Sequence, residues 1–346
     1  MTSALPKIRF RDTQVEMAHG AGGIASRRLI DGLFAPILFG SSREPLGDAA
    51  HLSIDGTRLA MTTDSFVIRP IRFPGGSIGE LAVNGTVNDL AVSGARAQAL
   101  VVSYVLEAGL HMDILEAEIR AMADAARRAG VRIAGGDTKV VEHGKADLMY
   151  ITTSGIGSLI PGIRISPASV RVGDQILLSG PIGDHGITIL LARGELHLEA
   201  DLRSDTRSVL PLVEALAAAV GGGIRWMRDP TRGGVATSLN ELARDCGLGV
   251  QLAEDRIPIR DPVRGACELL GLDPLHIANE GQFLAVVAAE CAAAALDALR
   301  KTPGGEDAVL IGEIYREPAG TVLVTTLYGG SRIVDMLVGD PLPRIC

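Results

Sequence analysis

The chain has 346 residues, of which 47% are hydrophobic and 21% carry a charge. At about 150 residues per domain, this length predicts two domains with a sizeable core. The composition excludes intrinsic disorder, collagen and a disulfide scaffold. The net charge of −8 argues against general nucleic-acid binding, because neutralising phosphates requires a basic face.

Cysteines and apolar runs indicate the compartment. The four cysteines are widely scattered and none forms a CxxC pair, which is typical of a reducing compartment and argues against a zinc or iron–sulfur site. The N-terminus lacks the apolar stretch of a secretory signal, and no apolar run reaches the roughly 18 residues of a membrane span. We therefore expect a cytoplasmic protein without membrane contacts.

Strands and helices are predicted to alternate in the first half. A helical pattern with Leu29, Ile30, Leu33 and Phe34 on one face follows the Gly-rich stretch His19–Gly23. The strands expected next are Arg58–Thr63, Ala97–Leu106, Val131–Ala134 and Leu148–Ser154, and the helices are Ser77–Ser93 and Met112–Ala129.

The segment Pro161–Pro167 (PGIRISP) separates this half from a second one. The strands expected there are 175–179, 248–252, 282–288, 309–315 and 321–327, and the helices are 184–193, 206–220, 233–245 and 289–300. After Tyr328, two glycines open an 18-residue tail, 329–346. We expect this tail to hold one or two helical turns at most and to lie apart from the core.

Three aspartates are predicted where a strand or helix meets a loop. Asp64 ends LAMTTD, Asp89 lies beside Asn84 and Asn88 in NGTVNDLAVSGA, and Asp137 follows two glycines in AGGDTKV. Such carboxylates suit Mg²⁺ that also holds nucleotide phosphates, and the glycines let the backbone approach those phosphates. Taken singly, each aspartate also fits a helix or turn cap.

The stretch Gly20-Ala21-Gly22-Gly23 precedes a predicted helix. It fits an anion-binding turn, a G-x-G-x-x-A fingerprint or a simple loop. The fingerprint is the weakest of the three, because no clear strand precedes the glycines. There is no Walker A sequence, so a nucleotide site here is not of the P-loop type.

Two motifs of the second half carry charge beside glycine. In DPTRGG (229–234), Asp229 lies near Arg232, whose guanidinium can fork onto a phosphate. The same motif also fits an ordinary helix start. Glu280 stands before a strand in NEGQ, as either a turn residue or a general base.

His19 and Cys346 stand out by their positions. The seven histidines show no HxxxH or HExxH spacing, and we expect His19, beside the glycines, to have a role and most of the others to lie at the surface. Cys346 is the final residue, on a tail that spans about 60 Å when fully extended. Chance placement is one explanation, and a swinging-arm carrier is the other.

Together these motifs resemble the HypE family of hydrogenase maturation proteins, within the PurM-like ATP-binding superfamily. The motifs are HGAGG (19–23), TTDSFV (62–67), NGTVNDLAVSGA (84–95), AGGDTKVV (134–141), SGPIGDHG (179–186), DPTRGG (229–234), NEGQF (279–283) and PRIC (343–346). They run the length of the chain, and the combination of GGDTKVV, DPTRGG and a terminal PRIC is the most specific part.

The resemblance implies an α/β (α+β) PurM-like fold and a homodimer paired through the N-terminal sheets. Residues 1–45 would cover the nucleotide, 46–160 would form the N-terminal ATP-binding domain, 168–328 the second α/β domain and 329–346 a mobile tail.

The resemblance also implies an ATP-dependent dehydration on the chain's own terminal cysteine. A carbamoyltransferase, HypF, would load Cys346 as an S-carboxamide, ATP would phosphorylate the amide oxygen, and loss of phosphate would leave an S-cyanate. The cyano group would pass to iron on the HypC–HypD complex, toward nickel–iron hydrogenase. The implied site residues are Asp64, Asp89 and Asp137 for Mg²⁺; Gly20, Gly22, Gly23, Asn84, Asn88, Thr138, Asp229 and Arg232 for ATP; and Cys346, Lys139 and Glu280 for catalysis.

Three alternatives remain open from the sequence. A PurM-like kinase or ligase on a free small molecule, such as thiamine-phosphate kinase or aminoimidazole ribonucleotide synthetase, would not need the terminal cysteine. Selenophosphate synthetase uses a reactive cysteine or selenocysteine near its N-terminus, whereas the first cysteine here is Cys246. A non-catalytic scaffold whose tail docks a partner is the third.

Overall fold

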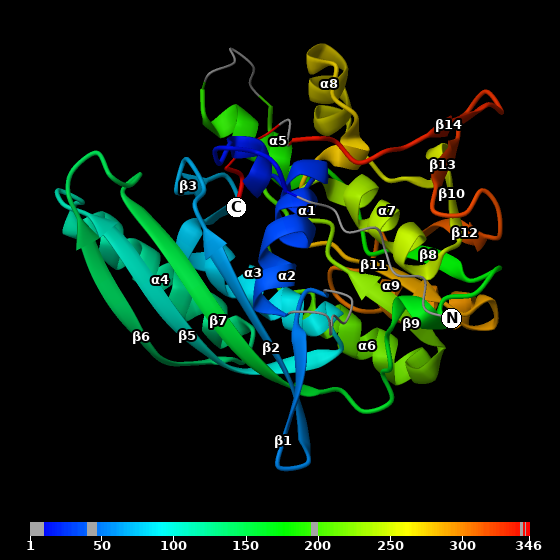
Figure 1. The fold of residues 1–346 in the computed structure, drawn as a ribbon, viewed down its shortest axis with the longest axis horizontal. Coiled ribbons are helices and arrows are strands. Elements are labelled where there is room, and N and C mark those ends of the chain that lie inside the picture. Colours follow the sequence, from blue (N-terminus) through cyan, green and yellow to red (C-terminus); the bar gives the residue numbers. More distant parts are fainter. Residues whose placement is uncertain (1–9, 40–46, 195–199, 340–341, 343) are drawn as a thin grey trace.

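The computed structural model describes residues 10–39, 47–194, 200–339, 342 and 344–346. They form two α/β domains, each built on one mixed sheet, and a C-terminal tail that returns from the second domain toward the first (Figure 1). No helix within these described ranges is both long and apolar enough to cross a bilayer.

The first sheet has five strands in the spatial order β1–β2–β7–β5–β6, in which β5 and β6 are parallel and the other neighbours are antiparallel. The elements of this domain are β1 (Ala50–Ile54), β2 (Thr57–Phe66), the small hairpin β3 (Arg72–Phe73) and β4 (Gly76–Ser77), α3 (Ile78–Val92), β5 (Ala95–Glu107), α4 (Met112–Arg128), β6 (Arg132–Val141) and β7 (Met149–Leu159).

Helix α3 lies between the first sheet and the second domain. All of its 15 residues are buried except Glu80 and Asp89, as expected for a helix that is apolar on every side. The sheet has one face against this helix and one open face. In β2, Thr62 and Phe66 are buried toward α3, whereas Met61 and Thr63 are exposed on the open face.

The second sheet has seven strands in the order β14–β13–β10–β12–β8–β11–β9. Its strands are β8 (Gln175–Leu178), β9 (Ile224–Arg228), β10 (Gly249–Ala253), β11 (Leu284–Val287), β12 (Val309–Tyr315), β13 (Val322–Thr325) and β14 (Ser331–Ile333), and the helices of this domain are α5 (Asp184–Ala192), α6 (Leu210–Val220), α7 (Gly234–Cys246), α8 (Asp261–Leu270) and α9 (Ala292–Arg300). One face packs against α6 and α9, and the other packs against α7.

Before the first sheet, α1 (Ile24–Leu29), a π-helical turn (Ile30–Phe34) and α2 (Ala35–Leu38) form one continuous helical segment. Leu33 and Phe34, which were expected on its apolar face, stay exposed. Short 3₁₀ turns are Met17–Gly20, Pro167–Ser169, Gly221–Gly223, Glu254–Arg256, Pro274–His276 and Ala289–Cys291.

The predicted strands and helices are present with ends shifted by a few residues, and β6 is the exception. It continues through Gly135 and Gly136, where the sequence predicted a loop. A Cβ at Gly136 would lie 2.0 Å from the carbonyl oxygen of Val102 on β5, so glycine here permits close strand pairing rather than a turn.

Six elements were not predicted, and all are short. They are the strands β1, β3, β4, β9 and β14 and the helix α8. β1 pairs with β2, β3 with β4 and β14 with β13, all close in the sequence, whereas β9 pairs with the distant β11. β14 is a strand where the sequence predicted helical turns. The tail is also not apart from the core, because Leu342 is 3% and Ile345 1% exposed. Prolines 341 and 343 of the tail lie outside the described residues.

Candidate functional site

Three carboxylates from both domains meet at the end of α3. Asp48 precedes β1, Asp89 is on α3 and Asp229 follows β9, and each offers one oxygen within 4.8 Å of the others. The Thr62 hydroxyl on β2 connects two of them, at 2.7 Å from the Asp48 carbonyl oxygen and 2.9 Å from Asp89 Oδ2.

Burial and mutual repulsion make the ionised forms of these carboxyl groups unfavourable. Burial raises the pKa of Asp89 well above its usual value, and Asp229 adds to the rise. Burial and the nearby Asp48 do the same to the pKa of Asp229. The Thr62 hydroxyl shares its proton between the Asp48 carbonyl oxygen and Asp89 Oδ2, and its bond to Asp89 acts against burial by lowering the pKa of that carboxyl.

This cluster fits Mg²⁺. All three ligand atoms are oxygens, as Mg²⁺ prefers, and the burial of like charges leaves excess negative charge that a cation would neutralise. The neighbouring Arg228 supplies only part of that compensation, with its Nε 3.0 Å from Asp48 Oδ1.

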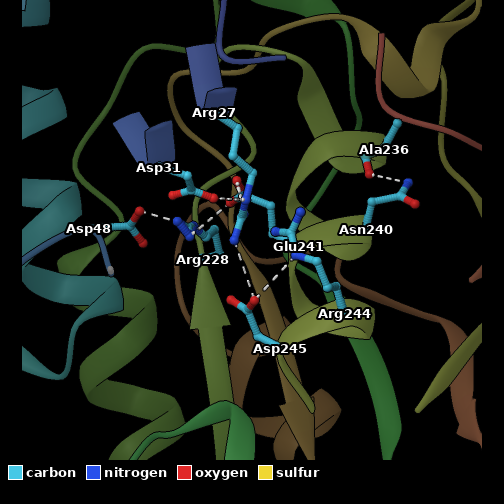
Figure 2. Close-up of polar contacts among 9 residues, drawn as sticks. All are labelled: Arg27, Asp31, Asp48, Arg228, Ala236, Asn240, Glu241, Arg244 and Asp245. Carbon is cyan, nitrogen blue, oxygen red and sulfur yellow. Dashed lines mark hydrogen bonds and ion pairs between the residues drawn. The ribbon is translucent and has the colours of Figure 1, made fainter. Parts of the chain in front are cut away.

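An ion-pair network connects the cluster to the N-terminal segment (Figure 2). Arg228 contacts Glu241 Oε2 at 3.3 Å, and Arg27 on α1 donates to Glu241 Oε1 at 3.0 Å. Arg27 also pairs with Asp31 at 3.2 Å and lies 3.5 Å from Asp245. Glu241 is therefore shared, so α1 is tied through one carboxylate to the arginine that holds Asp48.

Two further acids face the cluster. Burial raises the pKa of Asp64 on β2, against the opposing charge of Arg232. Burial, with Asp229 and Asp64 nearby, raises the pKa of Glu280 well above its usual value. Glu280 is 3% exposed, and its Oε1 has no hydrogen-bond partner among the described residues. A buried carboxyl with a shifted pKa and an open acceptor is a candidate for proton transfer.

The structure joins the Gly-rich stretch to DPTRGG. Arg232 Nη1 donates to the Gly20 carbonyl oxygen at 2.8 Å, and a Cβ at Gly22 would lie 2.8 Å from Arg232 Cβ. At Gly23, a Cβ would lie 2.2 Å from the Leu337 carbonyl oxygen. The first amides of α1 already donate to the tail, Ile24 to Leu337 at 2.9 Å. In this arrangement the glycines hold the N-terminal segment against Arg232 and the tail.

Asn84 and Asn88 connect α3 to the second domain. Asn84 Nδ2 lies 3.3 Å from Thr206 Oγ1. Asn88 donates to the carbonyl oxygens of Arg207 and Glu280 and accepts from the Val209 amide at 2.8 Å. Both ends of Asn88 are thus engaged within the chain, and a nucleotide contact by either asparagine stays a prediction.

Asp137 lies apart from the cluster within one chain. Strand register aligns Asp64 with Thr153, Thr153 with Val102 and Val102 with Gly136. Asp137, one residue on, therefore points to the opposite face of the sheet, three strands and about 14 Å away. The expected metal set of Asp64, Asp89 and Asp137 does not assemble within one chain.

The neighbours of Asp137 lie on the same edge strand. Lys139 is exposed and donates to Asp137 Oδ2 at 2.6 Å, and the Thr138 amide donates to Asp137 Oδ1 at 2.8 Å. The expectation that the three aspartates end their elements is also wrong. Asp64 lies inside β2, Asp89 inside α3 and Asp137 inside β6.

The surface prediction holds for His51, His111 and His143, which are exposed, and fails for His185, while a functional role for His19 stays a prediction. His19 organises its own segment, with Nδ1 2.8 Å from the Glu16 amide nitrogen and Nε2 3.0 Å from Asp12. His185, expected at the surface, is 0% exposed and contacts the tail. The tail itself ends beside β2, where the Val67 amide donates to the Cys346 main-chain oxygen at 3.0 Å.

Sequence reasoning missed Asp48, Thr62, Arg228 and Asp205. Asp48 carries the same signal as the others, a glycine neighbour before a strand, and Arg228 directly precedes DPTRGG. Asp205 had no such signal. Its carboxylate accepts the Glu280 and Gly281 amides at 3.1 Å each, so it fixes the loop that carries Glu280.

The chain matches known families along most of its length. Residues 46–159 match the N-terminal domain, and residues 171–325 the C-terminal domain, of AIR synthase related proteins. Carbamoyl dehydratase HypE of Azotobacter vinelandii is 49% identical over 99% of this chain and 100% of its own. The chain belongs to the HypE carbamoyl dehydratase family.

Solved structures of HypE proteins agree. A HypE in complex with ATP is 46% identical, with a TM-score of 0.80 over 96% of this chain and 100% of its own. A HypE–HypF complex gives a TM-score of 0.84 at 41% identity, over 89% of this chain and 99% of that chain. The two mixed-sheet domains therefore have the PurM-like fold of HypE proteins.

Proposed function

We propose that this chain dehydrates an S-carboxamide on Cys346 to an S-cyanate at the expense of ATP, and so supplies cyanide ligands for the iron of nickel–iron hydrogenase. The observation that carries the proposal is the position of the last residue. Cys346 is held at Val67, directly after β2 and three residues, or about 10 Å of extended chain, from Asp64 on that strand.

The reaction balances as an oxygen transfer from carbon to phosphorus. The amide oxygen attacks the terminal phosphorus of ATP, ADP leaves, and one N–H proton is lost. The carbon–oxygen bond then breaks, phosphate leaves with the oxygen, and the second N–H proton is lost as the nitrile forms. The site must therefore hold triphosphate charge and accept two protons.

The chain's residues divide these tasks. Asp48, Asp89 and Asp229 would hold Mg²⁺, which neutralises phosphate charge when bound, and Asp64 lies near them. Arg232 is the cation facing Asp64 and Glu280, placed to contact phosphate oxygens. Glu280 is the proton acceptor in this scheme, because a carboxylate with a raised pKa binds a proton more readily once ionised.

We further propose a homodimer through the open face of the first sheet. Met61 is 46% and Val101 48% exposed on that face, which is unusual for apolar residues in the middle of a sheet. The strand register places Asp137 and Lys139 on the same face of the sheet as Val101. In the dimer these two residues and Thr138 would contribute to a nucleotide site from the partner copy.

The proposed reaction needs one partner protein that loads the Cys346 thiol and another that receives the cyano group. A HypF-type carbamoyltransferase would load Cys346, as supported by the HypE–HypF complex of a relative. A HypC–HypD-type complex would accept the cyano group.

The test is the intact mass of the protein after incubation with HypF, carbamoyl phosphate and ATP. We expect a gain of a carboxamide followed by a loss of water, both absent in Cys346→Ala. Cys291→Ala is the matched control, since Cys291 is also half-buried, and it should react normally. Modification of Cys246, Cys267 or Cys291 instead would contradict the proposal.

A further inference from the structure

The last three residues of the chain are each held through a main-chain oxygen. The Arg344 carbonyl accepts from Arg193 Nη2 at 2.8 Å, and the Ile345 carbonyl from His185 Nε2 at 2.6 Å. The Cys346 oxygen accepts from the Val67 amide at 3.0 Å. The two donor side chains come from α5 of the second domain and its C-terminal end, and Val67 comes from the first, so the tail is gripped from both sides.

The state of His185 follows from its partners. A carbonyl oxygen only accepts, so Nε2 must carry the proton toward Ile345. Nδ1 then accepts from the Ser204 hydroxyl, 2.7 Å away, which fixes this tautomer. His185 is fully buried, and burial lowers its pKa to about 4. The imidazole is therefore a neutral, oriented donor at physiological pH.

Arg193 ties the tail to the segment after β2. Its Nε donates to the Arg69 carbonyl at 3.1 Å while Nη2 donates to Arg344. The Arg69 amide in turn lies 3.4 Å from the Arg344 oxygen. With the Val67–Cys346 bond, this places the C-terminal residues antiparallel alongside residues 67–69, which follow β2.

These contacts do not depend on what the sulfur carries. All of them go to main-chain oxygens. Two side chains of the tail also anchor it: Ile345 is 1% exposed, and the Arg344 guanidinium donates to the Val67 carbonyl oxygen at 3.2 and 3.3 Å and pairs with Asp147. We infer that His185 and Arg193 form, with Val67, a seat that positions Cys346 equally well as thiol, carboxamide and cyanate. This inference rests on the proposed function in one respect, namely that Cys346 is the residue that carries the carboxamide. His185 acts here as a positioning residue.

The first test measures access to the thiol without ATP or partners. Cys346 is alkylated with iodoacetamide, and the rate is read from its peptide, with the Cys291 peptide as an internal reference. We expect His185→Leu to raise the Cys346 rate roughly tenfold, as one lost buried hydrogen bond implies. His185→Gln, whose amide nitrogen can replace Nε2, should stay within about twofold. A Cys346 rate unchanged in His185→Leu would overturn the seat.

A matched control separates the seat from the tail in general. His276 Nε2 contacts the Asp335 carbonyl at 2.9 Å, which is the same chemistry ten residues earlier. His276→Leu should leave the Cys346 rate unchanged, and an equal rise there would contradict a specific role for His185. If His185→Leu does not fold, Arg193→Leu, at a half-buried position, provides the same comparison.

The second test separates positioning from chemistry. In protein already carrying the carboxamide, His185→Leu should slow a single round of dehydration roughly tenfold without changing ATP affinity. His185→Gln should restore it, and failure of Gln to do so would overturn the hydrogen-bond basis. If wild-type protein is loaded but never loses water, the proposed function fails, while the alkylation rates still decide the seat.

Discussion

At the scale of single residues, the site concentrates negative charge in a buried place. Burial is the main cause that raises the pKa of Asp89, Asp229 and Glu280, and a neighbouring aspartate is the second: Asp229 for Asp89 and Glu280, and Asp48 for Asp229. The compensating side chains named above are Arg228 and Arg232. Such a cluster lowers the free energy of unfolding unless a cation binds it. Loss of stability of this kind is common at functional sites.

Replacing one of these acids should therefore stabilise the metal-free protein. The folded-state pKa of Asp89 lies above the usual 3.8, so its contribution to stability is present below about pH 4 and is lost as the pH rises through the folded pKa. Asparagine does not ionise, so Asp89→Asn should not lose this stability at high pH. We expect its free energy of unfolding at pH 8 to exceed that of the wild type by about 1–2 kcal/mol, measured by urea unfolding without Mg²⁺.

The same variant should bind Mg-ATP about tenfold more weakly, measured by calorimetry. Asp137→Asn is the stability control, because Asp137 is exposed and outside the cluster. If Asp89→Asn is less stable than the wild type at pH 8, the ionised Asp89 carboxylate does not destabilise the metal-free protein, and the prediction is wrong.

His185 should make stability depend on pH in the opposite direction. Its folded pKa of about 4 lies below the usual 6.5, so its contribution is present above pH 6.5 and is lost as the pH falls toward 4. Between pH 7 and 5 this amounts to about 2 kcal/mol. Urea unfolding should show that His185→Gln loses less stability than the wild type over this range, and parallel pH profiles would contradict the buried neutral state.

At the scale of elements, β6 shows how glycine permits an unexpected strand. The pair Gly135-Gly136 resembles a loop in the sequence, yet both residues lie in the parallel pairing with β5. Only Gly136 needs to be glycine, because a Cβ there would meet the Val102 carbonyl, whereas at Gly135 nothing lies within 4 Å. This strand carries Asp137 and Lys139, so the pairing also positions candidate site residues.

Gly136→Ala should consequently force β6 away from β5. We expect a loss of about 1–3 kcal/mol in the free energy of unfolding, as for other steric insertions. Amides of residues 99–107 should also exchange faster with solvent. Gly135→Ala is the matched control and should stay within about 0.5 kcal/mol of the wild type. Equal effects at both positions would point to backbone entropy rather than to the contact with Val102.

At the scale of the whole molecule, the first sheet has one covered and one open face. α3 and α4 pack on the covered face, and the described residues leave Met61 and Val101 exposed on the other. The proposed pairing with a second copy would account for both the open face and the separation of Asp137 from the acidic cluster.

A charge on that face should therefore dissociate the dimer. We expect Met61→Glu to sediment as a monomer at concentrations where the wild type is a dimer, with at least tenfold weaker association. Met112→Glu, 71% exposed on α4, should not change the sedimentation. A wild type that is monomeric throughout, or a Met61→Glu variant that still dimerises, would exclude this interface.

Much of the fold and part of the site could be predicted from the sequence. Long elements such as α3, α4, β5 and β7 have strong periodic patterns, and motifs such as DPTRGG and NEGQF marked Asp229, Arg232 and Glu280. Local patterns suffice for these because turn chemistry and apolar spacing act over a few residues. The resemblance to HypE proteins also came from the sequence.

Only the tertiary structure decided which residues meet. Strand register put Asp64 and Asp137 on opposite faces, since one residue of offset reverses a side chain. Asp48 joined Asp89 and Asp229 through packing of distant segments, and His185 became buried because the tail returned to α5. Proximity in space depends on long-range pairing that no local pattern records, so the sequence determined the elements and motifs and the tertiary structure determined the site.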